Sequence, residues 1–321
     1  MSGKIIVTGG AGFIGSNIIA ALNARGEDDI LVVDDLGKDE KWKNLVGLRY
    51  EDYIDKDHFR NAVQHDALEK VRAVFHMGAC SSTTEQDATF LADNNYRFTR
   101  DLCEWCLRNG TRFIYASSGA TYGDGSTGYS DLDDATYALK PLNMYGYSKH
   151  MFDLWALKND LMSTIVGLKF FNVYGPREDH KGDMRSVVNK AYGQILETGE
   201  VKLFKSYNAA YKDGEQVRDF VYVKDAVEVC LYFMDKPRAA GLFNVGTGKA
   251  RTWIDLVSAV FAAMGKPPKI QFIDMPETLR AKYQYHTQAN VAKLQHAGYT
   301  NPFTSLEDGV KDYVATWLAK R

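Results

Sequence analysis

The sequence predicts an α/β fold, a doubly wound parallel sheet with a smaller and mostly C-terminal second domain. A β-branched run at residues 4–8 leads through the glycines of 9–15 into a helical pattern. Strand-like runs then alternate with helical segments, which favours a parallel sheet covered on both faces. This alternation stops after residue 174. Together the observations indicate a Rossmann-type fold followed by a second domain.

The glycine turn of residues 9–15 predicts a dinucleotide site. Gly9 permits a tight turn, Gly12 lets the backbone approach a pyrophosphate, and Gly15 allows the helix to pack closely on the strand. The N-terminus of that helix offers free N–H groups and a dipole that favours an anion. A purely structural turn is the alternative, and the position between strand and helix argues against it.

Further strands are expected near residues 29–33, 72–76, 112–116 and 164–169. Ligands of such sheets bind at the carboxyl ends of the strands. We therefore expect one rim to collect the residues that follow these strands, namely Gly9, Gly12, Asp34, Ala79 and Ser118.

The domain boundaries follow from where the alternation stops and resumes. Residues 124–140 are rich in glycine, serine and aspartate and are expected to form a surface loop, whereas a helix is expected near 184–197. Residues 219–225 and 241–246 have strand character again. The sequence thus predicts a cofactor domain of residues 1–174 plus about 219–246, and a substrate domain of about 175–218 plus 247–321.

Composition and charge exclude several classes of protein. The 321 residues are 45% hydrophobic and 25% charged, as in soluble globular proteins. A net charge of −2 gives no field that favours nucleic acid or a membrane surface. No apolar run approaches the ~20 residues of a membrane helix, and no signal-peptide pattern is present. We therefore expect a cytoplasmic protein with neither nucleic acid nor membrane as partner.

Four cysteines are too few and too scattered for a disulfide framework. Cys103 and Cys106 have the spacing of a metal or redox pair, but they stand inside a predicted helix. We interpret them as reduced packing residues and predict no metal site.

The choice between NAD and NADP is left open by the residues. Asp34 ends the second expected strand, where an acidic residue commonly binds the adenosine ribose, and a carboxylate there would repel a 2′-phosphate. Lys38, Lys41 and Lys43 follow closely and could supply compensating charge.

A candidate catalytic group lies on the helix that Asn143 is expected to cap. Tyr145 and Lys149 are four residues apart and therefore share one face. Lowering the pKa of a tyrosine from ~10 to ~7 requires roughly 4 kcal/mol, about what one ammonium at ~4 Å supplies at an effective dielectric of ~20. We therefore expect Lys149 to lower the pKa of Tyr145, while Ser118 orients the substrate oxygen.

These motifs resemble those of the extended short-chain dehydrogenase/reductase family. The resemblance is carried by residues 8–15, Ser118 ahead of 122–123, Tyr145 with Lys149, and residues 172–176. It implies action on a nucleotide sugar. Dehydratases of the family carry an Asp-Glu pair directly after the Ser/Thr position, where this chain has Gly119 and Ala120. Epimerisation or net oxidation therefore remains.

Within that family the chain is similar, nearly end to end, to the epimerases of ADP-linked heptoses. The matching segments are residues 80–85, 93–96, 176–182, 218–223 and 280–284. The resemblance implies that bound NADP oxidises C6″ of the sugar and that hydride returns to the opposite face. It also implies a homo-oligomer, in particular a pentamer, and a place in the synthesis of lipopolysaccharide core precursors.

The resemblance also implies roles for individual residues. Tyr145 and Lys181 would be the two proton partners, with Ser118 orienting the substrate and Lys149 holding the cofactor. The cofactor site would comprise Gly9, Gly12, Phe13, Ile14, Gly15, Asp34, Asp35, Lys41, Lys56, Met77, Gly78, Ala79, Cys80, Ser81, Asn94, Lys149, Val173 and Lys181. The substrate contacts would be Ser118, Asn172, Asp183, Lys190, Phe204, Lys205, Ser206, Tyr207, Arg218, Arg280 and Tyr283.

The chain departs from the pattern at Asp183, Lys190 and Asp35, where a small hydroxyl residue, a histidine and an asparagine are usual. Alternatives are another nucleotide-sugar epimerase such as a 4-epimerase, a dehydrogenase, or a non-catalytic NADP-binding protein. The loop of residues 177–182 argues against a 4-epimerase. The catalytic triplet formed by Ser118, Tyr145 and Lys149 argues against a binding protein.

Overall fold

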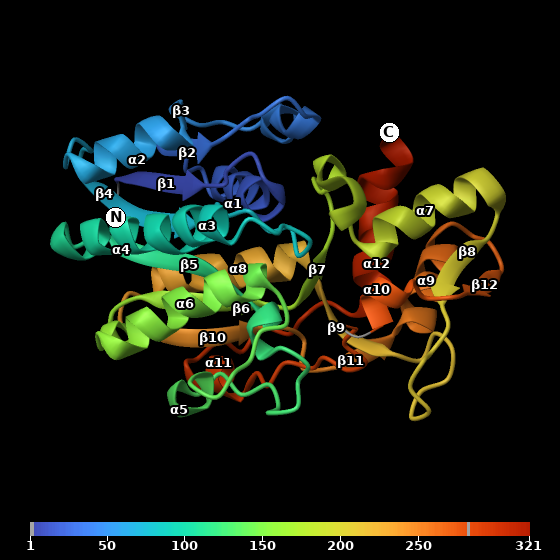
Figure 1. The fold of residues 1–321 in the computed structure, drawn as a ribbon. Coiled ribbons are helices and arrows are strands. Elements are labelled where there is room, and N and C mark those ends of the chain that lie inside the picture. Colours follow the sequence, from blue (N-terminus) through green and yellow to red (C-terminus); the bar gives the residue numbers. More distant parts are fainter. Residues whose placement is uncertain (1–2, 281–282) are drawn as a thin grey trace.

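The computed structural model describes residues 3–280 and 283–321. A seven-stranded parallel sheet has the order β10-β6-β5-β4-β1-β2-β3, which confirms the predicted Rossmann-type architecture (Figure 1). Its strands are β1 Lys4–Thr8, β2 Ile30–Asp34, β3 Asp52–Asp55, β4 Val71–His76, β5 Arg112–Ser118, β6 Val166–Phe170 and β10 Gly241–Val245.

The two faces of this sheet are covered by different helices because the side chains of β1 alternate. Ile5 and Val7 belong to one apolar cluster with α1 (Phe13–Ala24) and α8 (Val223–Asp235). Ile6 belongs to a second cluster with three other helices, on the opposite face. These are α2 Lys56–Gln64, α4 Phe98–Arg108 and α6 Met144–Lys158. Both layers are therefore packed, as a parallel sheet requires.

A smaller part of the molecule lies beyond the carboxyl ends of the sheet strands (Figure 1). It contains the parallel pair β8 (Val201–Phe204) and β12 (Ile270–Ile273), with α7 (Val187–Thr198) and α12 (Leu306–Thr316) packed on α9 (Trp253–Ala263).

Short helices occur in both parts of the molecule. Helices α3, α5 and α11 contact α6 or β10 of the larger part, and they span Ala88–Leu91, Asp133–Thr136 and Ala292–His296. Helix α10 spans Glu277–Arg280.

A three-stranded sheet lies between the two parts, with the order β11 (Ala250–Thr252), β9 (Val217–Tyr222), β7 (Asn172–Tyr174). The strand character expected over residues 219–225 is confirmed for 219–222 but was wrong for 223–225, because β9 ends at Tyr222 and α8 begins at Val223. The strand also belongs to this small sheet and not to the large one. The division of the chain into two domains stays a prediction.

Other boundaries shift by a few residues. The expected helix near 184–197 begins at Val187, where the Ser186 hydroxyl accepts from the N–H of Asn189. The loop of 124–140 contains the short α5. Among the described helices none is long and apolar enough to cross a membrane.

Candidate active site

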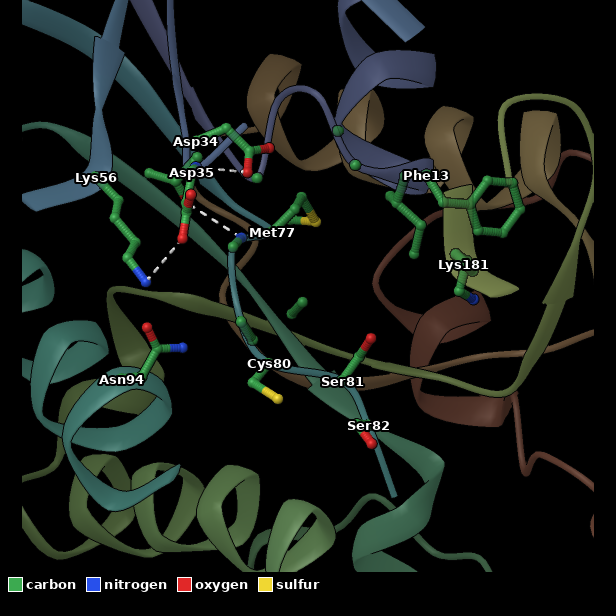
Figure 2. Close-up of a pocket in the computed structure, with 18 of the residues that line it drawn as sticks. Phe13, Asp34, Asp35, Lys56, Met77, Cys80, Ser81, Ser82, Asn94 and Lys181 are labelled. Atoms are coloured by element: carbon green, nitrogen blue, oxygen red, sulfur yellow. Dashed lines mark hydrogen bonds and ion pairs between the residues drawn. The ribbon is translucent and has the colours of Figure 1, made fainter. Parts of the chain in front are cut away.

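A cavity of about 560 Å³ opens at the carboxyl ends of the large sheet (Figure 2). Every residue that the sequence predicts to bind the cofactor lines this cavity, and so do Ser118 and Tyr145. The expected rim of Gly9, Gly12, Asp34, Ala79 and Ser118 is therefore brought together. The functions of these residues stay predictions.

The glycine turn is packed so tightly that side chains would not fit. A Cβ at Gly15 would lie 2.1 Å from the carbonyl oxygen of Gly9, and a Cβ at Gly9 would lie 2.7 Å from the backbone of Gly78. Gly9 also has φ 64°, a conformation that favours glycine. Helix α1 begins directly after Gly12 and has no acidic residue in its first turn. The turn thus offers bare backbone and a helix N-terminus, which suits a pyrophosphate.

Two carboxylate–ammonium pairs line the cavity near the ends of β2 and β3. Asp34 accepts from the N–H of Ala11 at 2.8 Å and from the Nζ of Lys41 at 2.9 Å. The Nζ of Lys56 lies 3.4 Å from a carboxylate oxygen of Asp35 (Figure 2). Both carboxylates that the sequence places near the ribose therefore have a cationic partner.

Buried polar contacts connect the glycine strand to the strand beside it. His76 is fully buried, with Nδ1 2.7 Å from the hydroxyl of Thr8 and Nε2 2.9 Å from the hydroxyl of Thr99. Because Thr99 donates to the carbonyl of Asn95, its oxygen accepts from Nε2–H. His76 is thus neutral, and burial lowers its pKa to about 3.

Asn95 extends this network to α6. Its side chain accepts from the N–H of Cys80 and donates to the carbonyl of Cys80, both at 2.9 Å. It also donates to Ser148, whose hydroxyl donates to the carbonyl of Tyr145. One amide side chain therefore fixes the loop of Cys80 relative to α6.

Tyr145 lies at the first turn of α6, beside the end of β5. The side chain of Asn143 accepts from the N–H of Gly146 at 2.8 Å, which confirms the predicted helix cap. A Cβ at Gly146 would lie 2.8 Å from the carbonyl of Ala120, so the helix end packs directly on the turn after β5. That turn follows Ser118, the last residue of β5.

The expectation that Lys149 lowers the pKa of Tyr145 was wrong. Burial raises the pKa of Tyr145, and the hydrogen bond with the Ser118 hydroxyl opposes this only in part. Burial also lowers the pKa of Lys149, to about 8, although the carboxylate of Asp153 works in the other direction. Desolvation has the largest effect on the pKa of both groups. The spacing of the two residues does not encode desolvation.

Behind Ser118 lies a fully buried ion pair. The Nζ of Lys169 is 2.7 Å from Oδ2 of Asp153, and neither side chain is exposed. The hydroxyls of Ser117 and Tyr115 donate to the same carboxylate. Lys169 also donates to Thr121, whose hydroxyl lies 2.8 Å from the carbonyl of Ser118. The pair thereby connects β5, β6 and α6 beneath the cavity.

Lys181 reaches the cavity from a short helix at Asp179–Met184. Its Nζ lies 5.2 Å from the centre of the Phe13 ring (Figure 2). Burial lowers the pKa of Lys181, and the carboxylate of Glu178 opposes that shift. Lysines in charged loops are mostly exposed, whereas the structure places Lys181 in the cavity wall.

Ser118 apart, the predicted substrate contacts lie outside the described lining of this cavity. Two aromatic rings flank Arg218, whose guanidinium lies 5.5 Å from the ring centre of Trp253 and 5.1 Å from that of Tyr283. Burial lowers the pKa of Arg218. A buried guanidinium held between aromatic rings is suited to a phosphate or another anion.

A second group of these contacts gathers around Asp274. Lys205 and the hydroxyl of Tyr207 contact its carboxylate at 3.1 and 3.0 Å. The guanidinium of Arg280 lies 3.8 Å from the ring centre of Tyr207. Phe204 and Ser206 flank Lys205 at the end of β8. The matching segment of 280–284 includes residues 281–282, which lie outside the described residues.

The remaining predicted substrate contacts belong to neither of these two groups. Asn172 is exposed on β7, Asp183 is exposed on the helix of Lys181, and Lys190 is partly buried on α7. Sequence reasoning missed several lining residues, including Asp39, Phe90, Phe98 and His180. Only His180, which adjoins Lys181, carried a local signal.

Comparison with known proteins places the chain among nucleotide-sugar enzymes. The NAD dependent epimerase/dehydratase family matches residues 5–246. An ADP-L-glycero-D-manno-heptose-6-epimerase of Nitratidesulfovibrio vulgaris Hildenborough is 59% identical over 315 residues, covering 98% of each chain. The crystal structure of the Helicobacter pylori ADP-L-glycero-D-manno-heptose-6-epimerase superposes with a TM-score of 0.84 at 30% identity, covering 98% of this chain and 96% of that one.

A more distant structure informs the cofactor. The Thermus thermophilus UDP-glucose 4-epimerase, solved in complex with NAD, has a TM-score of 0.75 at 27% identity and covers 97% of this chain and 98% of its own. With the family match, this supports a nicotinamide dinucleotide in the cavity.

Proposed function

We propose that this chain, which belongs to the NAD dependent epimerase/dehydratase family, inverts C6″ of ADP-D-glycero-β-D-manno-heptose to give ADP-L-glycero-β-D-manno-heptose. It is an isomerase whose relatives at 59% and 49% identity carry that name. The observation that carries the proposal is that Tyr145 and Lys181, two residue types able to transfer a proton, line one cavity from separate elements.

The residues of the cavity fit a nicotinamide dinucleotide. The bare glycine turn and the N-terminus of α1 suit its pyrophosphate, and the Asp34 end of the cavity suits a ribose. When bound, the nicotinamide takes a hydride from C6″ and later returns one to it. Lys149, buried on the same helix as Tyr145, is the proposed cofactor clamp.

Inversion requires a proton partner for each face of the sugar carbon. Oxidation removes the proton of the 6″-hydroxyl, and reduction of the other face returns a proton to the oxygen. The raised pKa of Tyr145 keeps its phenol protonated at neutral pH, and the lowered pKa of Lys181 eases formation of a neutral amine. The hydroxyl of Ser118, hydrogen-bonded to Tyr145, can orient the same substrate oxygen.

We propose NADP as the bound form of the cofactor. Lys41 and Lys56 pair with Asp34 and Asp35, which reduces the repulsion that two carboxylates would exert on a 2′-phosphate. Arg218, buried between Trp253 and Tyr283, is the proposed contact for the diphosphate of the sugar nucleotide.

The proposed setting is the cytoplasmic synthesis of heptose precursors for the lipopolysaccharide core, with the protein as a homo-oligomer, a pentamer in particular. Analytical ultracentrifugation of the purified protein tests the assembly, and a monomer would contradict it.

The decisive experiment incubates the protein with ADP-D-glycero-β-D-manno-heptose and follows the configuration at C6″ by NMR. We expect conversion without net change in nicotinamide absorbance, whereas a dehydrogenase would consume free cofactor. Tyr145→Phe and Lys181→Ala are expected to block conversion while cofactor is retained. Tyr147→Phe, on an exposed tyrosine of the same helix, and Lys158→Ala, on an exposed lysine, are the matched controls.

A second measurement identifies the cofactor. The denatured protein should release NADP, and release of NAD alone would contradict that part of the proposal. Near-normal conversion by Lys181→Ala would contradict the use of two proton partners while leaving epimerisation intact.

A further inference from the structure

The segment of residues 176–186, here named the Lys181 loop, is held by the C-terminal part of the chain. The hydroxyl of Tyr313, on α12, lies 3.1 Å from Oε1 of Glu178. The indole N–H of Trp317 donates to Oδ2 of Asp179 at 2.9 Å, and the guanidinium of Arg321 contacts the same carboxylate. Two consecutive carboxylates of the loop are therefore engaged by residues far along the chain.

The contact between Glu178 and Tyr313 is buried. Glu178 and Tyr313 have no exposed surface. A buried carboxylate requires several hydrogen-bond donors, and Glu178 receives them from the backbone N–H and the hydroxyl of Ser186 as well as from Tyr313. Asn189 donates to both Asp179 and Tyr313. The contacts of Glu178 and those of Asp179 therefore form one connected network.

The loop also stores backbone strain beside Lys181. Arg177 is not a glycine, yet it has φ 73°. Such strain persists only where surrounding contacts determine the conformation. The guanidinium of Arg177 lies 5.4 Å from the ring centre of Trp317 and donates to the carbonyl of Asn44. The amide of Asn44 in turn donates to the carbonyl of Arg177 at 3.0 Å and lies 3.1 Å from Nδ1 of His180.

We propose that Tyr313 and Trp317 are positioning residues for proton transfer: by holding Glu178, Asp179 and Arg177, they fix the loop from which Lys181 reaches the cavity. The inference rests on the proposed function of Lys181. Neither aromatic residue belongs to the described lining of the cavity, so they act through the loop. A shift of the loop by about 1 Å is enough to lower the rate of a proton transfer substantially.

The surroundings of Lys181 provide a readout that a general loss of stability would not move. Burial lowers its pKa, Glu178 raises it, His180 is the neighbouring titratable group, and the Phe13 ring faces Nζ. A loosened loop admits water to Lys181, and its pKa then rises toward its ordinary value.

The experiment compares Tyr313→Phe and Trp317→Phe with Tyr222→Phe. Tyr222 is the last residue of β9, and its hydroxyl donates to Asp312 of α12. The control therefore removes a tyrosine–carboxylate hydrogen bond of α12 that does not involve the Lys181 loop. For each protein we measure kcat and KM of the epimerisation, the content of bound cofactor, the thermal midpoint, and the pKa of Lys181. That pKa comes from trace acetylation at a series of pH values, read by mass spectrometry.

We expect kcat to fall at least ~10-fold in Trp317→Phe and Tyr313→Phe, with KM and cofactor content nearly unchanged. The pKa of Lys181 should rise in both variants, and Tyr222→Phe should resemble the parent protein in kcat and in that pKa. Parent-like kcat in both loop variants would overturn the inference. So would an equal loss in all three variants, because the cause would then be the docking of α12 in general.

Failure of the proposed function has a different outcome. If the parent protein does not convert the substrate, or if Lys181→Ala converts it normally, the function of Lys181 fails before the variants are compared. If Trp317→Phe does not fold, Tyr313→Phe, which deletes one oxygen atom, decides the inference by the same readouts.

Discussion

The Nζ of Lys41 lies 2.9 Å from Oδ1 of Asp34, and both side chains line the cofactor cavity. The carboxylate also accepts from the backbone N–H of Ala11, so it supports the glycine turn. This pairing reduces the negative charge that the Asp34 end of the cavity presents.

If the protein binds NADP as proposed, removing Lys41 should weaken that binding more than the binding of NAD. We expect Lys41→Ala to weaken NADP binding about 10-fold, the size of one charge-assisted contact, and to leave NAD binding unchanged or tighter. Calorimetric titration of the cofactor-stripped protein with each dinucleotide measures this. Lys43→Ala is the control, since Lys43 pairs with exposed Glu40 in the same segment. Equal weakening for both cofactors would show that Lys41 does not read the 2′-phosphate.

The buried His76 should make the protein sensitive to acid. Its folded pKa of about 3 lies below the unfolded value near 6.5, so the unfolded chain binds the proton more strongly. Stability is therefore complete above pH ~6.5 and is lost as the pH falls toward 3. We expect this residue to contribute a loss of about 2 kcal/mol between pH 7 and 5. Urea unfolding at both pH values should show that loss reduced in His76→Asn and unchanged in His65→Asn, on an exposed histidine.

The ion pair of Lys169 and Asp153 should be costly to break from one side only. Lys169→Met leaves a buried carboxylate without its cation, and we expect a loss of about 3–5 kcal/mol in the free energy of unfolding. Adding Asp153→Asn should recover part of this loss. Chemical denaturation of the two single variants and the double variant measures the coupling, with exposed Lys158→Met as the control. Strictly additive effects would contradict a coupled pair.

Two glycines inside helices should respond in opposite ways to alanine. At Gly15 the new Cβ would lie 2.1 Å from the carbonyl oxygen of Gly9, whereas at Gly193 it would meet nothing within 4 Å. We expect Gly15→Ala to lose bound cofactor and stability, and Gly193→Ala to gain up to about 1 kcal/mol from helix propensity. Cofactor content and thermal unfolding distinguish the two. Full cofactor retention in Gly15→Ala would contradict the proposed pyrophosphate site.

The features that the sequence predicted are those encoded by short spacings. The glycine turn, Asp34 at the end of β2 and the Asn143 cap are local, and the structure has them where they were expected. Strand β3 was not predicted, because Asp52–Asp55 is an edge strand with a charged residue at each end and no alternation of apolar and polar residues. Phe90 and Phe98 joined the cavity through packing between helices, which no motif records.

The largest difference concerns electrostatics. The spacing of Tyr145 and Lys149 predicted a lowered pKa for the tyrosine, but burial raises it, and burial depends on the whole fold. Lys181 shows the same limit. Its residue type and loop position indicate exposure, but it is partly buried. The loop that carries it is contacted by Tyr313 and Trp317, which lie more than 130 residues further along the chain.

The packing of α8 against α1 has a consequence for biosynthesis. The partner of the first helix is made only when residues 223–235 leave the ribosome, and β10 completes the edge of the large sheet beside β6 later still. A nascent chain of the first 170 residues therefore presents the apolar face of α1 to solvent and has an unfinished sheet edge. Such chains are prone to aggregate and to bind chaperones. Truncation ahead of α8 should accordingly give insoluble protein and not a stable half-molecule.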